Sequence, residues 1–146
     1  MNDVIEFEKA LTATGFKDEH IVMMHDRQAD VKNGGQGNES LPEHDKIVDV
    51  LGKFLKGMDE ADTAVVVLSG HGVMFKGDKS GYFCPVDAKL DPKAKLIPME
   101  GAGGIYTRLE ECKAGLANLI AVFATVPGKY AGFTAKAHKG MVRVTR

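Results

Sequence analysis

A single histidine, His71, stands between two glycines in the stretch AVVVLSGHG of residues 64–72. Apolar runs of this kind form buried strands, and the working groups of open α/β sheets collect where such strands end. An imidazole titrates near neutrality and acts as a general acid or base. The N–H of Gly72 is placed to stabilise an oxyanion. The stretch therefore predicts acid–base chemistry at His71, with a plain loop histidine as the alternative.

The other candidate side chains favour structural roles. Cys84 and Cys112 are the two cysteines of the chain, and they allow at most one disulfide and no spaced set of metal ligands. Free cysteine is among the most buried residue types, so packing is favoured over a nucleophilic role for both. His25 could reach the rim of a site, but a solvated loop position is favoured. No pair of histidines has metal-ligand spacing, and no cofactor is predicted.

Helices and buried strands alternate along the chain, which predicts an α/β fold with parallel strands. Two strands are predicted by the apolar runs IVMM (21–24) and LIAVFA (119–124), and a third by residues 64–72, which end in an exit turn. Residues 73–83 have the pattern of a hairpin. The helices are predicted from Asn2 or Asp3 to Gly15, from a capping box of Ser40 and Glu43 through Met58, and around Ile105, Leu109 and Cys112.

Composition excludes several classes of protein. The 146 residues suffice for one domain, and 44% hydrophobic with 27% charged residues is typical of a soluble globular chain. The longest apolar runs fall far short of the ~18 residues of a spanning helix, and the N-terminus lacks the pattern of a signal peptide. A net charge of −1 gives no field that would attract nucleic acid. A cytoplasmic location is the expectation.

Residues 101–104 read GAGG, which raises a generic phosphate-binding domain as another alternative. The stretch follows a loop and not a strand, and it lacks the lysine of a P-loop. This alternative is the weakest of those considered.

Several motifs in combination resemble the large-subunit region of caspase-like cysteine peptidases, especially bacterial caspase homologues and metacaspases. They are AVVVLSGHG, the hairpin after it, YFCPVDA, and LIPMEGAGGIYTRLEECKAGLANLI. The resemblance implies helices on a mostly parallel sheet over residues 1–126, with the first core strand of the family missing. Residues 127–146, basic and without an acidic residue, are expected to form a poorly ordered tail.

The resemblance also implies roles for individual residues. His71 matches the family's catalytic histidine, and Gly72 matches its oxyanion glycine. The run LIAVFATV places Thr125 at the position of the cysteine nucleophile and Phe123 at an acidic position that helps bind a basic residue of the substrate. A hydroxyl is far less acidic than a thiol, so Thr125 is a poor replacement. Asp87 is expected to fix the turn after the hairpin.

The roles implied by the resemblance predict a pseudo-peptidase, which binds a peptide or protein segment in a crevice at the strand ends. The alternative is an active cysteine endopeptidase in a full-length or differently framed form of the chain, with His71 as the general acid or base. A relocated thiol is another route to that activity.

Overall fold

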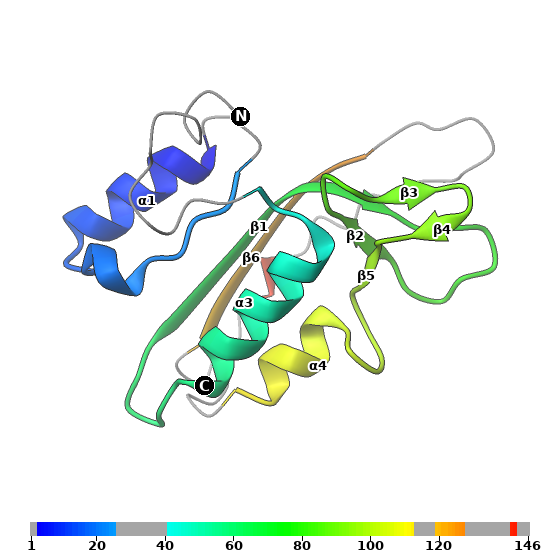
Figure 1. Ribbon diagram of the computed structural model, residues 1–146. Helices are drawn as coiled ribbons and strands as arrows, with labels where there is room; N and C mark the ends of the chain where they lie inside the picture. The colour runs from blue at the N-terminus through cyan, green and yellow to red at the C-terminus, as the bar shows by residue number, and fades with distance from the viewer. Residues whose placement is uncertain (1–2, 26–40, 113–118, 128–140, 143–146) are drawn as a thin grey trace. The chain divides into compact units, whose positions relative to one another are not determined.

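The computed structural model describes residues 3–25, 41–112, 119–127 and 141–142 (Figure 1). The chain divides into two compact units, Met1–Pro42 and Glu43–Arg146. Each unit is described by itself below. Within the described ranges, no helix is long and apolar enough to cross a membrane.

The first unit contains helix α1 (Asp3–Ala13) and the short 3-10 helix η1 (Asp18–His20). Helix α1 confirms the predicted amphipathic helix, and Gly15, with φ of 100°, follows its end as predicted. The predicted strand at residues 21–24 is wrong, because only Met24 makes an isolated bridge there. An apolar run becomes a strand only when a neighbouring strand satisfies its backbone, and no ladder reaches this run in the described part of the chain.

The second unit is built on a five-stranded sheet of order β5-β2-β1-β6-β7, with a separate two-stranded β3-β4 sheet. The strands are β1 (Ala64–Val73), β2 (Tyr82–Cys84), β3 (Lys89–Leu90), β4 (Lys93–Ala94), β5 (Ile97–Pro98), β6 (Leu119–Pro127) and β7 (Met141–Val142). Strand β7 lies within the segment that the sequence assigned to a poorly ordered tail. The other residues of that segment after Pro127 lie outside the described ranges.

Strands β1 and β6 run side by side in parallel through nine residue pairs, from Ala64 with Leu119 to Gly72 with Pro127 (Figure 1). This pair confirms the predicted α/β class with parallel core strands. The neighbouring pairs β1-β2, β2-β5 and β6-β7 are antiparallel, so the sheet is mixed. Strands β1 and β2 follow one another directly in the chain, and β2 and β5 are joined by a segment that carries the β3-β4 pair, whereas the β1-β6 connection contains helix α4.

Helices α3 (His44–Lys56) and α4 (Ile105–Glu110) lie side by side along the β1-β6 pair (Figure 1). The two helices and the two strands share one core, because apolar side chains at helical and alternating strand spacings are buried together. Its members are Ile47, Leu51 and Leu55 of α3, Ile105 and Leu109 of α4, Ala64 and Val66 of β1, and Leu119 and Ala121 of β6. The predicted helical stripe of residues 47–58 is confirmed at its three buried positions.

The hairpin of β1 and β2 is closed by contacts around two aromatic rings. Phe75 and Tyr82 meet edge to face, with ring centroids 5.8 Å apart. The Lys93 ammonium lies 3.8 Å from the centroid of the Phe75 ring and donates a 3.0 Å hydrogen bond to Asp78 in the hairpin loop. These contacts hold the loop between the two strands against the β3-β4 pair.

Gly70 of β1 has no space for a side chain. A Cβ at this position would lie 3.0 Å from Cε2 and 3.1 Å from Cζ of Phe83. Phe83 is itself buried, at 6% exposed, so its ring has little room to withdraw. Because residue 70 is a glycine, the Phe83 ring of β2 can pack directly over β1.

We predict that Gly70→Ala lowers the free energy of unfolding by about 1–3 kcal/mol, because the added methyl overpacks the Phe83 ring. Chemical denaturation followed by circular dichroism measures the change. The matched control is Gly52→Ala in α3, where a Cβ meets only Arg108 Nη1 at 3.6 Å. The control should raise stability by about 0.5–1 kcal/mol through helix propensity. Equal effects of the two substitutions would contradict the packing argument.

Candidate active site

His71 lies inside strand β1 and not in a turn after it. The strand continues two residues further, to Val73, because β2 pairs with its last three residues. The exit turn that the sequence predicted at the end of residues 64–72 is therefore wrong. The His71 side chain is exposed even though strands flank it on both sides.

On the β6 side, the residue paired with the histidine is not the one at the predicted nucleophile position. Thr125 is paired with Gly70, and Val126 is paired with His71. Adjacent strands lie about 4.8 Å apart, so Thr125 and His71 occupy neighbouring strands one residue out of register. The structure thus brings both positions to the carboxyl ends of the parallel pair. Their chemical roles, and the oxyanion role of Gly72, remain predictions.

On the β2 side, His71 is paired directly with Cys84. Directly opposed residues of an antiparallel pair project from the same face, with Cβ atoms about 4.5–5.5 Å apart. The sequence analysis missed this pair because it predicted the hairpin without its register. The signal that could have found it is a glycine on one strand, Gly70, that can accommodate an aromatic ring, Phe83, on the next.

The two cysteines differ in exposure, and both are free. Cys84 is half-buried, and burial raises the pKa of its thiol because the thiolate would lose hydration. Cys112 follows the end of α4 and is 5% exposed, which agrees with the predicted packing role. His25 is also buried, at 5% exposed, so the predicted solvated loop position is wrong for this side chain. His138 lies outside the described residues.

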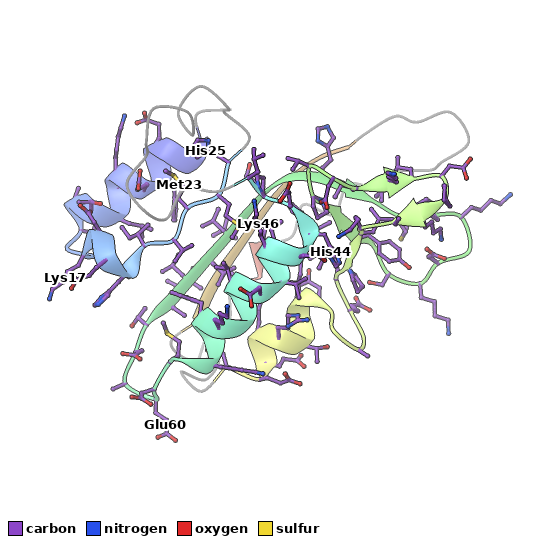
Figure 2. The ribbon with its side chains drawn as sticks, viewed as in Figure 1. Lys17, Met23, His25, His44, Lys46 and Glu60 are labelled. Carbon is purple, nitrogen blue, oxygen red and sulfur yellow. The ribbon has the colours of Figure 1, made fainter. Side chains whose placement is uncertain are left out.

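Asp87 connects the loop after β2 to the start of α3. Its Oδ1 accepts a 2.8 Å hydrogen bond from the backbone N–H of His44. His44 is the first residue of α3 and is labelled in Figure 2. The turn that carries Asp87 is closed by a 3.1 Å backbone bond from the Ala88 N–H to the Pro85 carbonyl, and the Asp87 side chain bonds α3 in place of the turn that the sequence expected it to fix. The predicted capping box is wrong, because Glu43 is the N-cap itself and makes no side-chain capping bond. A distant aspartate supplies the cap instead.

Lys95, Asp45 and Asp87 form a polar cluster at the start of α3. Lys95 Nζ donates a hydrogen bond to Asp45 and lies 3.9 Å from Asp87 Oδ2. The hydrogen bond from Lys95, with a second contribution from His44, holds the pKa of Asp45 below its ordinary value. The same hydrogen bond raises the pKa of Lys95. The Asp45 side of the cluster is exposed to solvent. The cluster therefore acts chiefly by holding the loop after β2 in place.

Within residues 3–25, 41–112, 119–127 and 141–142, no group of three His, Cys, Asp or Glu side chains is arranged to hold a metal ion.

The parallel β1-β6 pair, with His71 at its carboxyl end, is accompanied by a match to a known protein family. The family model of the caspase domain matches residues 1–123. The chain belongs to the caspase-domain family and shares the ancestry of its cysteine peptidases. Searches of curated proteins and of solved structures each gave no match. The matched range contains His71 and both cysteines and ends before Thr125.

We predict that Asp87→Ala lowers the free energy of unfolding by about 1 kcal/mol, because the first turn of α3 loses its acceptor. Asp87→Asn keeps an oxygen acceptor and should cost about half as much. Glu43→Ala removes the N-cap side chain that makes no capping bond, so it should change stability by less than about 0.5 kcal/mol. Chemical denaturation measures all three variants. A larger loss for Glu43→Ala than for Asp87→Ala would refute the assignment.

Proposed function

We propose that this chain is a caspase-family domain that binds an extended peptide at the carboxyl ends of β1 and β6 and does not cleave it. The observation that carries the proposal is the residue at the end of β6. A threonine stands at position 125, on the strand next to His71, where the resemblance to caspase-like peptidases expects the cysteine. A threonine hydroxyl needs a closely bonded base to attack a carbonyl, whereas a thiol ionises far more readily.

The positions of the two thiols support the same proposal. Cys84 lies on β2 and Cys112 follows α4, so neither belongs to the strand that carries position 125. The raised pKa of Cys84 disfavours a standing thiolate at neutral pH. A peptidase with this sequence would have to recruit a thiol from another element.

The exposure of His71 and the residue at position 123 support the peptide-binding part of the proposal. His71 is exposed at the end of the parallel pair and offers an imidazole to a bound peptide. Phe123 replaces the acidic residue that the resemblance associates with a basic side chain before the cut, so the peptide bound here is expected to be apolar and not basic at that position. Two free cysteines fit a reducing compartment, and we place the protein in the cytoplasm.

One experiment tests both halves of the proposal. The folded chain and its His71→Ala variant are incubated with three matched short peptides that differ only in a central Leu, Arg or Asp. Mass spectrometry follows cleavage, and amide NMR spectra follow binding. We expect no cleavage, and we expect the Leu peptide to shift the amide signals of residues 70–73 more than the Arg peptide does.

Cleavage by the wild-type chain that is lost in His71→Ala would overturn the proposal and establish a peptidase. Repeating that assay with Cys84→Ser would then decide whether a relocated thiol performs the reaction. Absence of any peptide-induced shift at residues 70–73 would overturn the binding half.

A further inference from the structure

The two neighbours of His71 offer different chemistry. On β6 its register partner is Val126, and on β2 its register partner is Cys84. Because directly opposed residues of an antiparallel pair share a face, the imidazole and the thiol project from the same side of the sheet. An imidazole beside a thiol is a base beside a nucleophile. Cys84 is thus the cysteine that the strand register places at His71.

Packing on the opposite face fixes this pairing. Phe83 lies next to Cys84 in β2, and its ring fills the space over Gly70 of β1. A shift of one residue between the strands would turn the ring to the other face and leave the glycine uncovered. The buried ring therefore holds Cys84 opposite His71.

His71 and Cys84 are accessible to a small reactant. His71 is exposed and Cys84 is half-buried, so a reactant can approach from the His71 side. Within the described part of the chain, the His71 imidazole and the Cys84 thiol engage in no hydrogen bond or ion pair, either with each other or with another side chain. Cys112 provides the contrast, because it is 5% exposed and lies on no strand of the sheet.

We propose that His71 and Cys84 form a thiol–imidazole pair that captures low-molecular-weight disulfides. This inference does not depend on peptide binding, because it uses the β1-β2 pair and not position 125. It assigns a modification site to a strand that the proposed function leaves without a chemical role.

The reaction is a thiol–disulfide exchange. The imidazole accepts the proton of Cys84 Sγ, and the thiolate attacks one sulfur of a disulfide RSSR. The bond between Sγ and that sulfur forms while the original S–S bond breaks, and the leaving thiolate takes the proton from the imidazolium. Cys84 becomes oxidised to a mixed disulfide, and one equivalent of RSH is released. Burial raises the pKa of the Cys84 thiol, so the proposal assigns its deprotonation to the neighbouring imidazole.

Glutathione disulfide is the probe for the test. The folded full chain is incubated with it at neutral pH, and intact mass with peptide mapping gives separate rates for Cys84 and Cys112. We expect the mixed disulfide on Cys84, with Cys112 reacting only after denaturation. His71→Gln should slow the reaction of Cys84 by roughly tenfold or more, because the base is lost. His20→Gln, which removes an exposed histidine of η1, should leave the rate unchanged.

A second measurement needs no variant. A synthetic peptide of residues 80–88 contains the same thiol without His71 and without burial. We expect Cys84 of the folded chain to react at least roughly three times faster than this peptide. A slower reaction in the folded chain would overturn the proposal, as would an equal Cys84 rate in wild type and a folded His71→Gln variant. Faster labelling of Cys112 than of Cys84 would also overturn it.

Discussion

The parallel ladder between β1 and β6 is the constraint on which the second unit depends. Its nine residue pairs align the carboxyl ends of both strands, and it places Gly70 and His71 beside positions 125 and 126. The same ladder presents Ala64 and Ala121 to the core that α3 and α4 share. Loss of this register would therefore disturb the helix packing and the candidate site together. The match to the caspase-domain family covers β1 and β6 as far as residue 123.

The short hairpin partner, β2, adds a second constraint by covering one face of β1 with Phe83 and presenting Cys84 on the other. The histidine consequently has a hydroxyl residue one position away along one neighbouring strand and a thiol directly opposite on the other. A hydroxyl and a thiol differ greatly in acidity, so these two neighbours support different chemistry. The two proposals for this site, a peptide-binding end of the sheet and a reactive thiol–imidazole pair, share His71.

Local pattern predicted the helices, the two core strands and the hairpin, because apolar periodicity and turn residues act within a few positions. Local pattern failed where the structure of a segment depends on partners that are distant in the sequence. The run at residues 21–24 has strand composition but joins no ladder among the described residues, and the start of α3 takes its cap from Asp87, 43 residues away in sequence. The opposition of His71 and Cys84 also depends on a cross-strand fit, between Gly70 and Phe83. Family resemblance supplied the expected role of His71, but it said nothing of this register.

The most direct test of the account is the register of β1 against β6 in solution, measured as interstrand nuclear Overhauser effects on isotope-labelled protein. We expect contacts that pair Gly70 with Thr125 and His71 with Val126, in the pattern of parallel strands. Contacts displaced by one residue, or the close Hα–Hα contacts of antiparallel strands, would contradict the account.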